Sequence, residues 1–266
     1  MTSAPPQRLI ILAAPARSGS TRLWHLLNVF NNVHSLGEYF NFGAQKDDNS
    51  TVLRPLFEGE PDNALFTHFR DRKACWESPI NAIRVAADRT TKNLTVKISP
   101  GRPAENTLAA LMRSAPTSVL MLKRRPIDSF ISLQKAVSLG KWGNVDTSAL
   151  TVTLSVKHYL SYLQKLSRFY AQVERAAQQA LVPTRQLTYE DHINIPDTVL
   201  LKYLATSLRM LDVNAGRIGA SDRTLRKKQD TVTNYANKVA NWEAFLEELA
   251  DYDLRLLSQL PKVNNG

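Results

Sequence analysis

Short, almost continuously apolar runs alternate with amphipathic segments along most of the chain. Residues 8–14 (RLIILAA) are typical of a strand buried on both faces of a parallel sheet. The apolar positions of residues 21–30 recur at helical spacing instead. Three further strands are predicted at residues 94–98, 118–123 and 181–188. Further helices are predicted at residues 103–113, 127–138, 149–179, 197–210 and 242–260.

Strands that alternate with helices favour an α/β fold. We expect a P-loop-like, three-layer architecture in which helices flank a central, mostly parallel β-sheet. Because no internal repeat or linker interrupts the pattern, residues 1–266 are interpreted as a single domain. Residues 43–80 are irregular and mixed in charge, and we expect residues 43–90 to form a variable acceptor-binding segment that covers part of a binding site.

The composition is that of a globular protein, with 43% hydrophobic and 22% charged residues in a chain of 266. One cysteine, Cys75, excludes an internal disulfide and fits a reducing compartment. No apolar run is long enough to span a bilayer, and the first residues do not resemble a signal peptide. These features predict a cytoplasmic location.

The formal net charge of +10 favours anionic partners, among them nucleotides, acidic glycans and lipid headgroups. Specific nucleic-acid binding is not expected, because the sequence has no recognition motif and no interleaved basic and aromatic platform. The five histidines do not pair at metal-ligand spacing, so no metal site is expected.

The loop after the first predicted strand departs from a Walker phosphate-binding loop. In the pattern G-x-x-x-x-G-K-[ST], Ala14 replaces the first glycine and Ser20 replaces the lysine that reaches the β- and γ-phosphates. A cation, Arg17, lies inside the loop instead. With Ser18, Gly19, Ser20 and Thr21 it would suit a single 5′-phosphate at a helix N-terminus. Taken alone, the segment is equally consistent with a strand-to-helix turn capped by serine and threonine.

Residues 8–27 resemble the 5′-phosphosulfate loop of sulfotransferases that use 3′-phosphoadenosine 5′-phosphosulfate (PAPS), in particular the bacterial carbohydrate enzymes of the Nod-factor and trehalose type. That branch reads P-R-S-G-S-T, and this chain reads A-R-S-G-S-T at residues 16–21, with Pro15 one position early. The similarity runs through most of the chain as four or five short motifs. It implies a sulfotransferase fold.

A second segment, residues 122–136 (LKRRPIDSFISLQKA), resembles the family's 3′-phosphate motif. The resemblance assigns Arg124, at a strand end, and Ser132, eight residues later on a helix, to the 3′-phosphate. A guanidinium fork and a hydroxyl donor suit phosphate oxygens. The alternative is a surface arginine and a helix-surface serine, but two phosphate motifs in the family's order argue against it.

Two weaker matches extend the proposed nucleotide site. Tyr189 begins a Y-E-D segment that resembles the one near the adenine in relatives, although a strand-end core aromatic explains it equally well. Residues 224–230 (TLRKKQD) resemble the late basic loop that closes over the 3′-phosphate. The resemblance favours Arg226 and Lys227, with Lys228 as an alternate, although basic loops are usually only solvated.

The general base suggested by the resemblance is Glu38, in the segment G-E-Y-F at residues 37–40. Apolar neighbours would raise the pKa of its carboxyl group toward neutrality, whereas composition alone favours an ordinary surface glutamate. Lys97 lies in V-K-I-S-P, where the cytosolic animal branch carries K-x-H-x-P. The histidine is absent, and Lys97 would polarise the sulfonate unless it only reaches solvent. His68, in the cover segment, is the other candidate base.

The resemblance implies transfer of a sulfuryl group from PAPS to an acceptor hydroxyl, with adenosine 3′,5′-bisphosphate as product and no metal. The expected acceptor is a carbohydrate or glycolipid, with contact to an anionic glycolipid or a membrane surface as a further expectation. Trp76 and Phe69 are candidate sugar platforms or core residues. Two alternatives stay open: a small-metabolite kinase that needs Mg²⁺ and ATP, and a non-catalytic protein that binds nucleotide or polyanion. The oligomeric state is also open.

Overall fold

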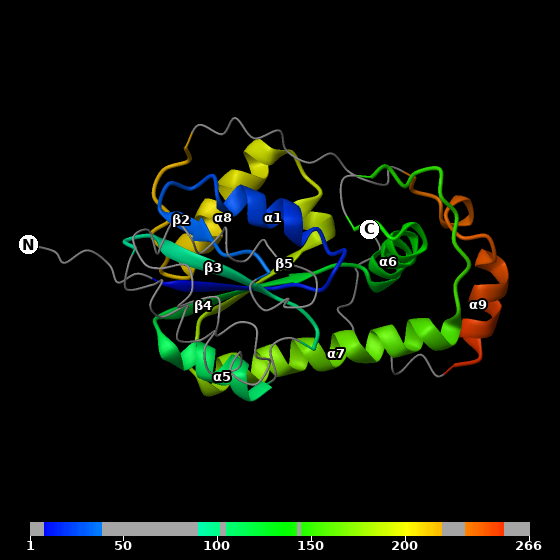
Figure 1. Cartoon of the computed structure of the whole chain (residues 1–266), viewed down its shortest axis with the longest axis horizontal. Coiled ribbons are helices and arrows are strands. Elements are labelled where there is room, and N and C mark those ends of the chain that lie inside the picture. The colour runs from blue at the N-terminus through cyan, green and yellow to red at the C-terminus, as the bar shows by residue number, and fades with distance from the viewer. Residues whose placement is uncertain (1–7, 39–89, 102–104, 143–144, 220–231, 253–266) are drawn as a thin grey trace, which may run out of the picture.

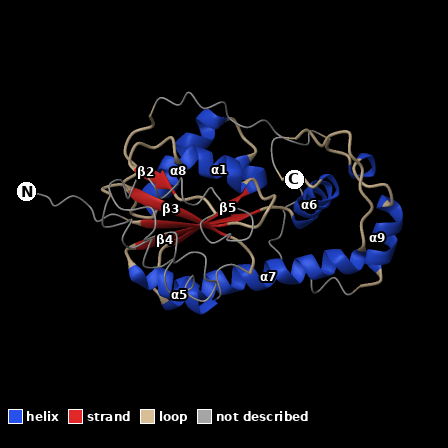
Figure 2. Cartoon of the chain, in the orientation of Figure 1, coloured by secondary structure: helices blue, strands red, loops and turns tan. Residues whose placement is uncertain are grey.

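The computed structural model describes residues 8–38, 90–101, 105–142, 145–219 and 232–252 (Figure 1). A sheet of five parallel strands forms its centre, in the order β2-β3-β1-β4-β5 (Figure 2). The strands are β1 (Leu9–Ala13), β2 (Val33–Ser35), β3 (Asn93–Ile98), β4 (Thr117–Lys123) and β5 (Thr184–Thr188). The predicted α/β class with a parallel central sheet is confirmed.

The first strand of the chain is the middle strand of the sheet. Leu9 of β1 pairs with Leu94 of β3 on one side and with Thr117 of β4 on the other. All five residues of β1 are buried, as its apolar sequence predicts. The loop that follows β1 therefore starts from a strand that is paired on both sides. It lies between the carboxyl ends of β3 and β4.

Helices cover both faces of the sheet, which gives the three predicted layers (Figure 1). Ile10 and Leu12 of β1 pack with residues of α1 (Ser20–Leu27) and α8 (Asp197–Met210). Ile11 and Ala13 face the other way, toward α5 (Glu105–Ser114) and α7 (Val156–Gln179). The alternation of side chains along one strand thus supplies two separate hydrophobic cores.

A third core lies beyond the carboxyl end of the sheet. There α6 (Pro126–Leu139) packs on the first half of α7, which extends past the sheet toward α9 (Trp242–Ala250) (Figure 1). Phe130 and Phe245 are buried and both contact Tyr159, with ring centroids 5.3 and 5.7 Å from its ring. This core fixes α6, whose N-terminal end follows β4 directly.

Several predicted boundaries were wrong. The helix expected at residues 149–179 begins at Val156, because Ser155 caps it and Val152 pairs with Val239 as an isolated bridge. β2 was not predicted, and β5 begins three residues later than expected. The helix expected at residues 242–260 ends at Ala250, and residues 253–260 lie outside the described part of the chain.

The described residues contain no helix that is long and apolar enough to cross a membrane.

Candidate functional site

The loop between β1 and α1 contains two residues with left-handed backbone, Arg17 at φ 64° and Gly19 at φ 88°. A Cβ atom on Gly19 would lie 2.5 Å from Cδ2 of Tyr189, too close for any side chain. Glycine is therefore required for both reasons, the positive φ and the contact with Tyr189. The close approach lets the loop pack directly against the residue that follows β5.

The hydroxyl groups predicted for this loop differ in their surroundings. Ser18 is buried, and its hydroxyl donates to the carbonyl of Pro15 at 2.7 Å, inside the loop. Ser20 is buried at the first position of α1, and Thr21 is half-buried beside it. The first turn of α1 carries no acidic residue. Its backbone N–H groups and the helix dipole therefore favour an anion at this end.

Arg17 connects the two segments that were predicted separately as phosphate sites. Its Nε donates to the hydroxyl of Ser132 on α6 at 3.0 Å, and its Nη1 donates to the carbonyl of Trp142 at 2.6 Å. The first motif follows β1 and the second follows β4, its neighbour in the sheet. Parallel pairing therefore brings them together at one edge.

Arg124 completes this contact from the end of β4. Its Nη1 donates to the backbone carbonyl of Arg17 at 2.7 Å, and its guanidinium lies 4.2 Å from the centre of the Tyr189 ring. Tyr189 therefore touches both phosphate segments, Gly19 through its ring edge and Arg124 through a ring face. The prediction that Tyr189 lies near the bound nucleotide stays a prediction.

The two arginines are close enough to repel each other. Burial lowers the pKa of Arg17, and the positive charge of Arg124 lowers it further. A tetrahedral anion between two partly desolvated guanidinium groups would remove this repulsion and accept hydrogen bonds from both. The electrostatics of the site therefore favour phosphate or sulfate.

Glu38 and Lys97 form an ion pair on the other side of β1. The pairing of β2 with β3 positions them, and the backbone N–H of Lys97 donates to the carbonyl of Gly37 at 2.7 Å. Both residues were predicted from the sequence, but their contact was not. The ion pair holds the carboxylate of Glu38 beside the ammonium group of Lys97 at the carboxyl end of β3.

Arg22 shows that a cation beside the loop can be structural. From α1 it forms an ion pair with Asp197 and donates to the carbonyls of Ile193 and Ile195. These bonds hold α1 against the start of α8. Sequence reasoning did not single out Arg22, and no local pattern identifies its partners.

Glu190 has a role that the sequence did not reveal. Its carboxylate accepts from the backbone N–H of Arg125 at 2.9 Å, at the N-terminal end of α6. The side chain of Arg125 donates to the hydroxyl of Tyr235 at 3.2 Å, and this bond raises the pKa of Arg125. The segment after β5 therefore helps to hold both α6 and the loop after β1.

Part of the predicted site lies outside the described residues. This applies to Arg226, Lys227 and Lys228, to His68, Phe69 and Trp76, and to residues 43–89 of the expected cover segment. Within the described ranges, no group of histidine, cysteine, aspartate or glutamate side chains could hold a metal ion.

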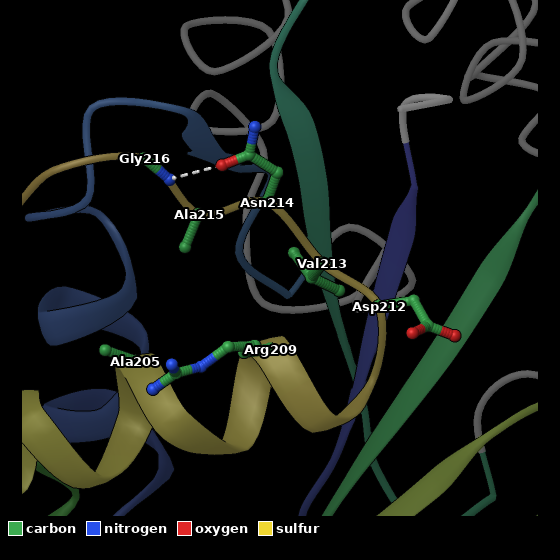
Figure 3. A pocket seen from close by; sticks show the side chains of 7 residues that line it. All are labelled: Ala205, Arg209, Asp212, Val213, Asn214, Ala215 and Gly216. Carbon is green, nitrogen blue, oxygen red and sulfur yellow. Dashed lines mark hydrogen bonds between the residues drawn. The ribbon is translucent and has the colours of Figure 1, made fainter. Parts of the chain in front are cut away.

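A separate pocket of about 560 Å³ lies at the opposite, amino end of the sheet (Figure 3). The loop after α8 forms one side of it, and the carbonyl of Asn214 there accepts from the side chain of Asn93, the first residue of β3. The lining residues are Ala205, Arg209, Asp212, Val213, Asn214, Ala215 and Gly216. This pocket shares no residue with the phosphate segments.

No protein-family model matches the chain, and no curated protein matches it. Similar solved structures include the sulfotransferase domain of the Synechococcus PCC 7002 olefin synthase, with 15% identity, a TM-score of 0.48, and coverage of 96% of this chain and 98% of that one. Sulfotransferase STF1 from Mycobacterium tuberculosis H37Rv has 13% identity and a TM-score of 0.43, covering 79% of this chain and 68% of that one.

A tunicamycin resistance protein from Deinococcus radiodurans is also similar, with 12% identity, a TM-score of 0.43, and coverage of 76% of this chain and 95% of that one. Identities and TM-scores this low carry no information about function. Function is therefore inferred from the side chains of this chain.

Proposed function

We propose that this protein is a sulfotransferase that uses PAPS as donor and a hydroxyl group of a carbohydrate or glycolipid as acceptor. The observation that carries the proposal is the convergence of Arg17, Ser132 and Arg124 at the carboxyl ends of β1 and β4. Two adjacent cations with hydroxyl groups beside them suit a nucleotide that carries two separate phosphate groups.

The ion pair of Glu38 and Lys97 supplies the second part of the proposal. It lies at the carboxyl ends of β2 and β3, across β1 from Arg124. A donor held by α1 and α6 would thus have a carboxylate and an ammonium group on the side away from its 3′-phosphate. This arrangement suits a reaction in which an acceptor approaches from the side of β2.

In the proposed reaction, Glu38 takes the proton of the acceptor hydroxyl while the oxygen attacks sulfur. The bond between sulfur and the bridging phosphate oxygen breaks, and the bisphosphate leaves. Proton uptake neutralises Glu38, which releases Lys97 to stabilise charge on the sulfonate or on the bridging oxygen. Arg17, as a catalytic residue, and the backbone N–H groups of the loop and α1 stabilise the transferring sulfonate and the 5′-phosphate that departs.

A small-metabolite kinase is the main alternative. The described loop has Ser20 where a Walker loop has the lysine that reaches the β- and γ-phosphates. A kinase would bind Mg²⁺ and ATP in preference to adenosine 3′,5′-bisphosphate, so a binding experiment separates the two.

The test is calorimetric titration with adenosine 3′,5′-bisphosphate, 5′-AMP and Mg²⁺–ATP. We expect preference for the bisphosphate, and Arg124→Ala should weaken its binding by about 10- to 100-fold, because a charged hydrogen-bonding partner is lost. Arg209→Ala changes an exposed arginine on α8 and is the matched control, which should bind normally. Preference for Mg²⁺–ATP would contradict the proposal.

A turnover assay then separates an enzyme from a binding protein. With PAPS and a panel of glycans and glycolipids, Glu38→Gln should lower sulfuryl transfer by about 10²- to 10⁴-fold, as expected for loss of a general base. Binding of the bisphosphate should change little. Strong bisphosphate binding without transfer to any hydroxyl would favour the non-catalytic alternative.

A further inference from the structure

Three buried polar atoms near the N-terminal end of α6 have no hydrogen-bond partner in the part of the chain that the structure describes. They are Nε of Arg124, Oγ of Ser129 and the hydroxyl of Tyr162. Ser129 is only 1% exposed. Buried polar groups in folded proteins are almost always satisfied, so three in one place require an explanation.

Ser129 extends the predicted phosphate motif along α6. It lies three residues before Ser132, so the two hydroxyls share one face of the helix. Ser132 accepts the hydrogen bond from Arg17 at that face. Ser129 lies one turn closer to the N-terminal end of the helix, where Arg125 is the N-cap and Arg124 precedes it.

Tyr162 reaches the same place from α7. Burial raises the pKa of its phenol to about 12, while the Ser129 hydroxyl and the charge of Arg124 each lower it. Both groups are therefore neighbours of the phenol, although no hydrogen bond of normal geometry joins the two hydroxyls. Tyr162 stays protonated at neutral pH and can donate.

Packing alone does not explain these hydroxyl groups. The ring of Tyr162 packs against Phe130, with centroids 5.3 Å apart, and phenylalanine would keep that contact. Tyr170, two turns later on α7, shows the ordinary arrangement, because its hydroxyl donates to the carbonyl of Leu122 at 2.8 Å. An unused donor beside an arginine indicates that a ligand supplies the missing acceptor.

We propose that Ser129 and Tyr162 belong to the phosphate site of Arg124. Their hydroxyls donate, directly or through one bridging water, to a phosphate monoester bound at that arginine. A monoester dianion has three terminal oxygens, more acceptor capacity than Arg124 and Ser132 use. The inference rests on the proposed function and identifies the bound group as the 3′-phosphate of the donor.

The test compares Tyr162→Phe and Ser129→Ala with Tyr170→Phe, which removes a satisfied hydroxyl from the same helix. Binding of adenosine 3′,5′-bisphosphate and of 5′-AMP, which lacks the 3′-phosphate, is measured with thermal unfolding of each free protein. Tyr162→Phe and Ser129→Ala should each weaken bisphosphate binding by about five- to tenfold. Binding of 5′-AMP should not change, and the melting temperature should stay equal or rise.

The control should behave in the opposite way. Tyr170→Phe leaves the Leu122 carbonyl unsatisfied, so its melting temperature should fall while both ligands bind as in wild type. Each of Tyr162→Phe and Ser129→Ala is informative without the other, in case one of them fails to fold.

Normal bisphosphate binding by Tyr162→Phe and Ser129→Ala would overturn the inference, and so would an equal loss for 5′-AMP. If Arg124→Ala alone weakened the bisphosphate, the proposed function would stand without this extension. If wild type did not prefer the bisphosphate over 5′-AMP, both would be overturned.

Discussion

Glu38→Gln and Lys97→Met remove opposite partners of one ion pair. The structure predicts that the two substitutions lower the free energy of unfolding by unequal amounts. The side chain of Lys97 is 7% exposed, whereas that of Glu38 is 37% exposed. In Glu38→Gln the ammonium stays buried beside a neutral amide. In Lys97→Met an apolar side chain of similar length occupies the buried position, and water can solvate the carboxylate that is left.

The magnitudes follow from these exposures. Breaking a fully buried pair by removing one partner costs about 3–5 kcal/mol, and an exposed pair contributes about 0–1 kcal/mol. The glutamine oxygen can still accept from the lysine, and solvent screens the pair. We therefore expect Glu38→Gln to lower the free energy of unfolding by about 1–3 kcal/mol and Lys97→Met by about 0–1 kcal/mol.

Urea unfolding of the two variants and of the double variant in one buffer provides the assay. The urea midpoint of Glu38→Gln should lie below that of Lys97→Met. The midpoint of the double variant should be close to that of Lys97→Met, since no ammonium group is then left buried. A larger loss for Lys97→Met than for Glu38→Gln would refute the reasoning, because the pair would then stabilise the fold through the lysine.

Two further changes test the geometry of the site. Gly19→Ala should lower the free energy of unfolding by about 2–4 kcal/mol in thermal or urea unfolding, because a left-handed φ and a 2.5 Å contact with Tyr189 both oppose a Cβ. Gly140→Ala is the control, because Gly140 has a φ of 62° and no atom within 4 Å of an added Cβ, so it measures the effect of φ alone on the free energy of unfolding. Equal losses of stability in the two variants would mean that the contact with Tyr189 contributes nothing. Burial raises the pKa of Tyr162 from 10.0 to about 12, so ionisation of its phenol leaves the free energy of unfolding unchanged below pH 10 and lowers it progressively as the pH rises to 12. Urea unfolding between pH 9 and 11.5 should show Tyr162→Phe with a pH dependence shallower by about 1 kcal/mol per pH unit near pH 11, and identical pH dependences would contradict the assignment.

Much of the fold could be predicted because buried parallel strands and amphipathic helices each leave a strong local pattern. The apolar runs at residues 8–14, 94–98 and 118–123 are strands in the structure. β2 escaped prediction because three residues carry too little pattern. The start of α7 was misplaced because the pairing of Val152 with Val239, which is distant in sequence, keeps that segment extended.

The candidate site could be predicted as a set of residues but not as a set of contacts. Resemblance selected Arg17, Arg124 and Ser132, and the structure places them together. The ion pair of Glu38 with Lys97 depends on the register of β2 against β3, which no local pattern encodes. The same limit explains why the sequence could not separate a structural arginine from one that is available to a ligand.

The central position of β1 also has a consequence for biosynthesis. The strand leaves the ribosome before its hydrogen-bonding partners, which include Leu94 and Thr117. At ribosomal rates of about 5–20 residues per second, its five apolar residues wait on the order of 5–20 s for those neighbours. Nascent chains that end before β4 would therefore expose an unpaired, aggregation-prone strand. They would also lack an ordered loop after it, so the nucleotide binding that we propose should begin only once both flanking strands have emerged.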